Sequence, residues 1–88
     1  MADTLTLILV TPQKLVLSAK AHWVEIPATS GEMRALPGHA PTLGELGEGT
    51  LRYEAASGTE QNRQSVKIKG GFFEVLGDKV TLLADATA

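Results

Sequence analysis

The sequence predicts an all-β domain, a flattened β-sandwich of about ten short strands, with a flattened barrel as the closely related alternative. Apolar residues recur mainly with a period of two, as in the alternation of Leu5, Leu7 and Leu9. Turn-forming residues recur at intervals of about 8–12 residues, and no segment carries an apolar stripe with helical spacing. The 88 residues suffice for one domain, so we expect a single sandwich over 1–88.

The first expected strand covers 4–10, with the three leucines on one face and Ile8 and Val10 on the other, so both faces are at least partly covered. Further strands are expected at 15–18 and 21–26. In the latter, alternation places Trp23 on one face and His22, Val24 and Ile26 on the other. Pro27 is expected to end this strand, because its nitrogen cannot donate to a ladder.

A turn at 29–31 leads into a short strand at 32–36, and a further strand is expected at 42–46, before a turn at 47–49. Between these strands, residues 35–41 form an elbow. Pro37 and Pro41 fix their own φ angles and extend the residues that precede them, and Gly38 permits a positive φ. The elbow is therefore stiff, and it carries one titratable side chain, His39.

In the second half, strands are expected at 51–55, 64–69, 73–75 and 80–83, with a loop tip at 56–59. Val66 and Ile68 should face inward. Gly70-Gly71 interrupts the alternation and predicts a bulge or a close backbone crossing. Gly77-Asp78 suits a two-residue primed turn that joins the last two strands into a hairpin.

Composition excludes several function classes. The net charge is −2, and the 8 lysines and arginines are scattered, which argues against nucleic-acid binding. There is no cysteine, so disulfides and thiolate sites are excluded. His22 and His39 stand 17 residues apart without the spacing of a metal site, and His22 is expected to be a partly exposed strand residue. No apolar run approaches the ~20 residues of a membrane helix.

The chain offers no catalytic arrangement. The glycine-rich segment 44–49 contains two glutamates and lacks a following helix, so we expect a turn rather than a phosphate loop. No serine lies in a G-x-S-x-G context, and the carboxylates are dispersed. We therefore expect no catalytic residue, no metal and no cofactor, which leaves a binding or scaffolding domain.

The order of several strings resembles the epsilon subunit of F-type ATP synthase, called delta in mitochondria. The sequence motifs that carry the resemblance lie at residues 10–12 together with 17–18, at 27–32, at 36–41 in the elbow, and at 49–52, 70–75 and 80–85. The resemblance implies a ten-stranded sandwich on the central stalk, without catalytic residues, that links the gamma subunit to the membrane rotor ring. It also implies a peripheral location on the cytoplasmic face of the cell membrane, or on the inner mitochondrial or thylakoid membrane, reached only through the complex.

The resemblance implies two contact sets. The gamma contacts would be Thr11, His39, Lys69 and Glu74, and the partner would also cover apolar side chains on the second face of the first strand. The c-ring contacts would be Ser30, Gly31, Glu32 and Met33. Arg34 and Lys69 depart from the family pattern, and Arg34 next to Glu32 is expected to change the charge of the loop that faces the ring.

Most members of that family continue into a helical hairpin that inhibits hydrolysis and, in some, binds ATP. Because this sequence stops at Ala88, we expect this polypeptide neither to bind ATP nor to inhibit hydrolysis. The coupling ion, proton or sodium, stays open, as does the reason for the short length. The alternative function is a free-standing β-sandwich adaptor for a peptide or glycan, which would need an exposed groove or edge strand.

Overall fold

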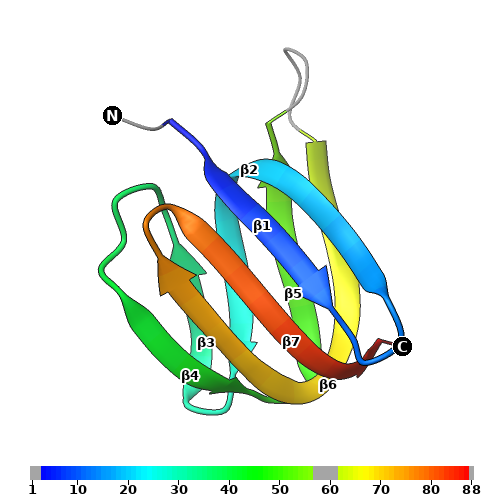
Figure 1. The fold of residues 1–88 in the computed structure, drawn as a ribbon. Coiled ribbons are helices and arrows are strands. Elements are labelled where there is room, and N and C mark those ends of the chain that lie inside the picture. The colour runs from blue at the N-terminus through cyan, green and yellow to red at the C-terminus, as the bar shows by residue number, and fades with distance from the viewer. Residues whose placement is uncertain (1–2, 57–61, 88) are drawn as a thin grey trace.

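The computed structural model describes residues 3–56 and 62–87, which form seven β-strands without a helix. The strands are β1 (Leu5–Val10), β2 (Leu15–Ala28), β3 (Gly31–Ala35), β4 (Thr42–Leu46), β5 (Gly49–Ala55), β6 (Asn62–Leu76) and β7 (Lys79–Thr87), shown in Figure 1. The all-β sandwich is confirmed. Of the expected loop tip, residues 57–59 lie outside the described ranges. Within those ranges no helix could span a membrane.

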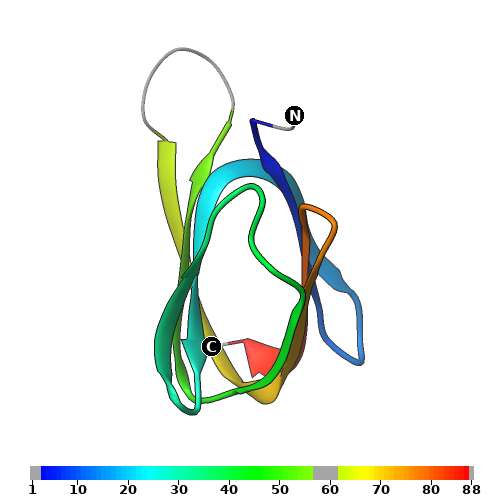
Figure 2. The same cartoon turned by 90° about the vertical axis from the view of Figure 1, so that its left-hand side faces the viewer.

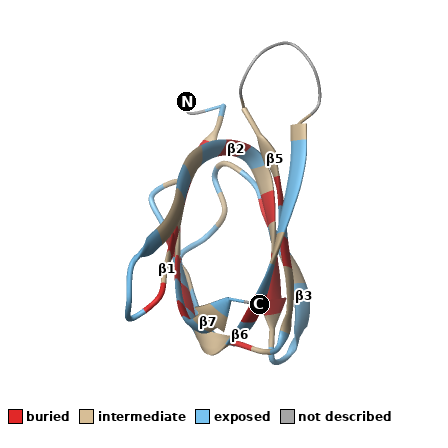
Figure 3. Cartoon of the chain, turned by 90° about the vertical axis from the view of Figure 1, so that its right-hand side faces the viewer, coloured by how far each residue is buried: buried red, intermediate tan, exposed pale blue. Residues whose placement is uncertain are grey.

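Two long strands explain why the expected number of about ten strands is wrong. β2 runs through the segments 15–18 and 21–26, and β6 runs through 64–69 and 73–75. Each of these long strands bends from one layer of the sandwich into the other: β2 arches over one end, and β6 crosses at the opposite end (Figure 2 and Figure 3). The expected pattern of short strands therefore counted the two halves of each bent strand separately.

The strands also form a closed hydrogen-bonded circuit, so the sandwich is a flattened barrel as well. β1 pairs with β7 in parallel and with β2 in antiparallel orientation, and the circuit continues through β7–β6, β6–β5 and β5–β2. β3 pairs with β2, and β4 pairs with β6 and touches β2 through the pair Ala28 and Leu46. We call the layer of β1, β7, β4, the first half of β2 and the second half of β6 the front layer. The back layer holds β3, β5, the second half of β2 and the first half of β6.

The bend in β6 is made by the two glycines. Gly70 and Gly71 have φ angles of 56° and 118°, in the region that favours glycine. The pairing register with β7 is the same on both sides of them, from Lys69 opposite Ala86 to Gly71 opposite Ala84. A Cβ on Gly71 would lie 2.0 Å from the carbonyl oxygen of Leu83. Of the two expectations for this pair, the close backbone crossing is therefore confirmed and the bulge is wrong.

In β2, two expectations are corrected. Pro27 does not end the strand: it is buried inside β2, and its carbonyl accepts a hydrogen bond from the Gly47 amide at 2.8 Å, so the backbone there remains paired. The alternation also breaks at His22, where the register with β5 shifts between Ala21 and Trp23. This irregularity turns Ala21 inward and leaves His22 exposed, so His22 does not share the buried face of Val24 and Ile26.

The core forms where the inward faces of the two layers meet. Leu5, Leu7 and Leu9, which were expected to share one face of the first strand, are all fully buried. Full burial of a leucine stabilises the fold by about 2 kcal/mol. Ile68 is buried and Val66 packs against the core, also as expected. From the back layer, Tyr53 contributes its ring, and burial raises the pKa of its hydroxyl above the usual value.

The hairpin of β6 and β7 has the predicted turn. Gly77 and Asp78 both have positive φ, 57° and 59°, between the paired residues Leu76 and Lys79. This is the primed turn whose twist matches that of the flanking strands. Asp78 is the only non-glycine residue with positive φ in the described ranges, and its side chain has a further role described below.

The Gly71 crossing yields a stability prediction. Gly71→Ala should destabilise the fold by roughly 3 kcal/mol, because it combines an unfavourable φ with a clash against backbone that has no room to move. Gly77→Ala is the matched control: it also has a positive φ, but a Cβ there meets nothing within 4 Å, so the cost should be about 1 kcal/mol. Urea unfolding measures both, and equal losses would show that the crossing is not tight.

Candidate interaction surfaces

The two outer faces of the sandwich differ in chemistry. Six large apolar side chains of the described residues are at least half exposed. Five of them belong to the front layer or to the β2 segment that pairs with β1: Leu15, Leu43, Phe72, Leu76 and Leu83. The sixth, Leu36, begins the elbow. The three ion pairs between described residues, in contrast, all lie on the back layer.

The apolar side chains meet on what we call the apolar face, defined by Leu43, Phe72, Leu83, Val10 and Pro12. Phe72 on β6 lies directly opposite Leu83 on β7, which in turn lies beside Val10 on β1. Leu43, Phe72 and Leu83 are 78%, 61% and 55% exposed. Apolar side chains gathered in this way on a monomer's surface are typical of an interaction site.

Two shallow hollows on the apolar face share Phe72 and Leu83. One, of about 220 Å³, extends over β4 and includes Leu43 and Glu74. The other, of about 330 Å³, extends to the end of β1 and includes Thr11. The structure therefore brings two of the expected gamma contacts, Thr11 and Glu74, to the rim of one apolar surface.

Thr11 has a structural role as well. It is buried, and its backbone exchanges hydrogen bonds with Lys14, from the Thr11 amide at 2.9 Å and from the Lys14 amide at 3.3 Å. Its hydroxyl also donates to the Lys14 carbonyl, at 3.4 Å. These bonds close the connection between β1 and β2 and hold Val10 and Pro12 in place at the rim.

Sequence reasoning did not select Leu43, Phe72 and Leu83. One signal was available: Phe72 and Phe73 are adjacent in a strand, so both rings cannot face the core. Phe73 is buried and Phe72 is exposed. Leu43 carried no comparable signal, because its exposure depends on which face of β4 packs against the core.

The elbow between β3 and β4 is a well-defined turn. The His39 amide donates to the Leu36 carbonyl at 3.0 Å, with Pro37 and Gly38 as the central residues and Gly38 at a φ of 87°. This arrangement has the hydrogen bond and residue types of a type II turn, and it confirms the predicted positive φ.

A carboxylate ties the elbow to the rest of the fold. The Gly38 amide donates to the Asp78 side chain at 2.7 Å, and the Asp78 carbonyl accepts from the Thr6 amide at 2.9 Å. The elbow, the β6–β7 turn and the start of β1 are thereby joined at one end of the sandwich. His39 is half-buried there, with its Nδ1 2.8 Å from the Ala40 carbonyl oxygen.

The expected gamma contact Lys69 lies elsewhere. It is exposed on β6 just before the glycine bend and lines a separate hollow of about 260 Å³ with Glu48, Thr50 and Lys67. The structure therefore does not bring Lys69 together with Thr11 and Glu74, because the bend separates the two halves of β6.

The expected c-ring contacts form the tip of the β2–β3 hairpin, at the other end of β3 from the elbow (Figure 1). Ser30, Gly31 and Glu32 are exposed, whereas Met33 is half-buried and packs against the core. The Thr29 amide donates to the Glu45 carbonyl at 3.0 Å, which braces the tip against β4.

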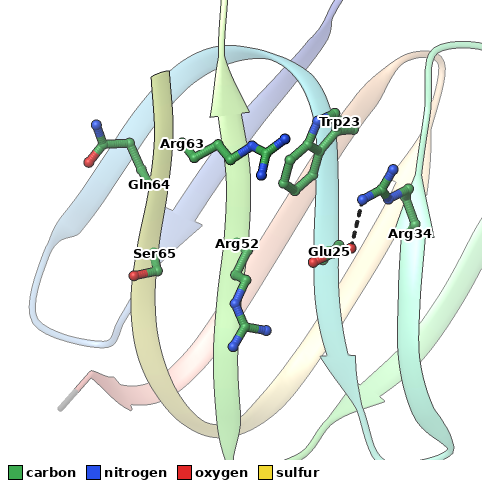
Figure 4. Close-up of a pocket in the computed structure, with 7 residues that line it drawn as sticks. All are labelled: Trp23, Glu25, Arg34, Arg52, Arg63, Gln64 and Ser65. Atoms are coloured by element: carbon green, nitrogen blue, oxygen red, sulfur yellow. Dashed lines mark hydrogen bonds and ion pairs between the residues drawn. The ribbon is translucent and has the colours of Figure 1, made fainter. Parts of the chain in front are cut away.

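Two ion pairs involve charged residues of β3 near this tip. Glu32 pairs with Arg52 of β5 at 3.0 Å, and Arg34 pairs with Glu25 of β2 at 2.8 Å. Arg34 also lies over the Trp23 ring, 4.5 Å from its centroid (Figure 4). Arg34 is therefore neutralised by a neighbouring strand and held over an aromatic ring, and it does not pair with Glu32.

No group of three or more His, Cys, Asp or Glu side chains within 3–56 and 62–87 is arranged to hold a metal ion.

Residues 4–88 match the family model described as the beta-sandwich domain of the ATP synthase delta/epsilon chain. The chain belongs to this family. The ATP synthase epsilon chain of Solibacter usitatus is 44% identical over 85 residues, which are 97% of this chain and 60% of that protein. The epsilon chain of Rhodobacter capsulatus is 41% identical, and the match covers 97% of this chain and 61% of that protein. The chain thus spans about three fifths of the length of these relatives.

Solved structures share the epsilon-type fold. A chain in the Euglena gracilis mitochondrial ATP synthase structure, which comprises OSCP, F1 and c-ring, superposes with a TM-score of 0.87 at 24% identity. The match covers 100% of this chain and 54% of that one. A chain in the structure of the Tetrahymena thermophila mitochondrial ATP synthase central stalk and c-ring superposes with a TM-score of 0.78 at 15% identity. This match covers 96% of this chain and 65% of that one.

Proposed function

We propose that this epsilon-type domain is a non-catalytic part of the central stalk of an F-type ATP synthase. It binds the gamma subunit through the apolar face and the c-ring through the β2–β3 tip, and it couples ion-driven rotation to ATP synthesis. The observation that carries the proposal is the one-sided exposure of Leu43, Phe72 and Leu83. The relatives named ATP synthase epsilon chain support it.

The apolar face suits a lasting partner. Leaving Phe72 and Leu83 more than half exposed forgoes hydrophobic stabilisation that a partner would restore. Glu74 and Thr81 at the rim of the same hollow supply polar groups around this apolar centre. An apolar centre with a polar rim is the usual anatomy of a protein interface.

The remaining expectations belong to the same proposal. His39 at the elbow and Lys69 before the glycine bend also contact gamma, in addition to Thr11 and Glu74. The domain lies peripherally at the membrane, on the cytoplasmic face or its organellar equivalent, through the complex. The domain itself needs no cofactor. Rotation would apply force to the elbow. The turn hydrogen bond from the His39 amide to the Leu36 carbonyl, and the bond from the Gly38 amide to the Asp78 side chain, hold the shape of the elbow.

The alternative, a free-standing adaptor for an extended peptide, would use an edge strand. Among the described strands, β3 pairs only with β2, so it has an open edge. It is five residues long and carries Glu32 and Arg34, and a short charged edge is typical of strands that avoid added partners.

Gamma binding is tested with the gamma subunit from the same genome. Wild-type chain should co-purify with gamma, and Phe72→Ser should weaken binding by about 2 kcal/mol, roughly thirtyfold in Kd. Gln64→Ser, an exposed change on the back layer outside the hollows that hold the proposed gamma contacts, should leave the Kd unchanged. Absence of wild-type association, or equal weakening by both variants, would contradict the proposal.

Contact with the c-ring is tested by crosslinking in the assembled synthase. The chain has no cysteine, so Ser30→Cys introduces a single thiol at an exposed position of the tip. We expect it to form a disulfide with a cysteine placed in the polar loop of the c-subunit. Ser18→Cys, exposed in the middle of the β1–β2 pair, should not crosslink. Equal crosslinking at the two positions would count against contact at the tip.

The elbow is tested with Pro37→Ala and Pro41→Ala together. Each change should cost about 0.4–1 kcal/mol of stability through the unfolded chain. The Tm of the double variant should fall only modestly. Its folded molecules should nevertheless bind gamma more weakly than the folded wild type does. A sharp fall in Tm with unchanged gamma affinity would instead identify the elbow as a purely structural corner.

A further inference from the structure

The apolar face carries carboxylates among its exposed apolar side chains. Leu43 on β4, Phe72 on β6 and Leu83 on β7 are the apolar side chains at its centre. Each is followed two positions later on its own strand by a carboxylate: Glu45, Glu74 and Asp85. Because side chains alternate in a strand, each carboxylate projects from the same face as the apolar residue before it.

The strand register brings apolar and acidic side chains together in two adjacent rows across the front layer, whose strands lie side by side in Figure 1. In one row, Glu45 lies opposite Phe72, and Phe72 lies opposite Leu83. In the next row, Leu43 lies opposite Glu74. Side chains directly opposite one another on one face are in contact range. A partner that covers the three apolar side chains therefore also covers Glu45 and Glu74.

These carboxylates are not neutralised by the chain itself. All three are exposed, and none forms an ion pair with a described residue, since the three ion pairs of the described ranges lie on the back layer. Among the described residues that line the two hollows, Glu74 and Asp85 are charged and none is basic. Lys79, on the same face of β7, lies opposite Leu76 and lines neither hollow. The apolar face is therefore locally acidic.

This charge restricts which partner can cover the face. An uncharged partner would remove water from the carboxylates without supplying a counter-charge, which is unfavourable. A second copy of this chain would be repelled, because a two-fold contact brings the same carboxylates of both copies together. An anionic lipid surface would be repelled for the same reason. A partner with lysines or arginines around its apolar side chains matches both the apolar and the acidic parts of the face.

We propose that the partner segment bound at the apolar face is amphipathic and basic. Its apolar side chains fill the two hollows beside Phe72 and Leu83, and its lysines or arginines pair with the three carboxylates, Glu45, Glu74 and Asp85. This inference rests on the proposed binding of gamma through the same face and states the chemistry that gamma presents there. Of the three carboxylates, only Glu74 was among the gamma contacts expected from the sequence.

The test compares two pairs of substitutions in the 88-residue chain, with immobilised gamma from the same genome as the probe. Glu45→Gln with Glu74→Gln removes two charges from the apolar face. This front pair should weaken gamma binding about five- to tenfold, mainly through slower association. Glu32→Gln with Glu54→Gln is the matched control: it removes the same charge from the back layer and should leave the Kd within about twofold.

Salt and the sign of the charge provide two further readouts. The wild-type affinity should fall as the salt concentration rises from about 0.05 M to about 0.5 M, and the front pair should show a smaller fall. Adding Asp85→Asn to the front pair should weaken binding again. Glu74→Lys should weaken binding more than Glu74→Gln does, because it places a like charge against the cations of the partner.

Circular dichroism melting checks that each variant folds like the wild type. The basic partner is overturned if the front pair binds gamma as tightly as the wild type or more tightly, or if the control pair weakens binding equally. Gamma binding through the apolar face still stands in these cases if Phe72→Ser weakens it, and the contact is then apolar only. If the wild-type chain does not bind gamma at all, both proposals are overturned.

Discussion

The close contact of Gly71 with the backbone at Leu83 is the constraint on which the arrangement of the surfaces depends. With no Cβ at residue 71, β6 keeps its pairing with β7 while it turns from the back layer into the front layer. The same strand therefore pairs with β5 over its first half and with β4 over its second half. A strand that could not bend here would force the two layers apart and open the core between them.

This bend also separates two chemistries along one strand. Before the glycines, the outward residues of β6 are Arg63, Ser65, Lys67 and Lys69; after them, they are Phe72, Glu74 and Leu76. The first set lies on the back layer, which carries the ion pairs. The second set lies on the front layer, which carries the apolar face. A small sandwich can in this way present one face to an apolar partner and keep the opposite face charged.

The elbow and the hairpin tip occupy the two ends of β3, and each is braced by a different part of the chain. Asp78 holds the elbow through the Gly38 amide, and the Glu45 carbonyl holds the tip through the Thr29 amide. A short brace at each end of one five-residue strand favours a constant separation between the elbow and the tip. That rigidity is what a domain placed between two moving partners would need.

Local chemistry was sufficient for several features. Alternation in a strand puts Leu5, Leu7 and Leu9 on one face, and this face packs against the core. Gly77-Asp78 forms the turn because both residues tolerate positive φ. Gly38 in the elbow has the predicted positive φ for the same reason. Sequence reasoning missed the shift at His22 and the continuation of β2 through Pro27, because both depend on hydrogen bonds to residues distant in the chain, such as Gly47.

The sequence by itself thus determined the all-β class, the positions of most strands and turns, the shared face of Leu5, Leu7 and Leu9, and the inward direction of Val66 and Ile68. Only the tertiary structure decided that two strands bend across both layers, that Phe72, Leu83 and Leu43 form one face, and that Arg34 pairs with Glu25. Backbone conformation and alternation act between neighbours in the chain, so the sequence displays them directly. Which side chains share a surface depends on strand pairing between distant segments, and that pairing exists only once the chain has folded.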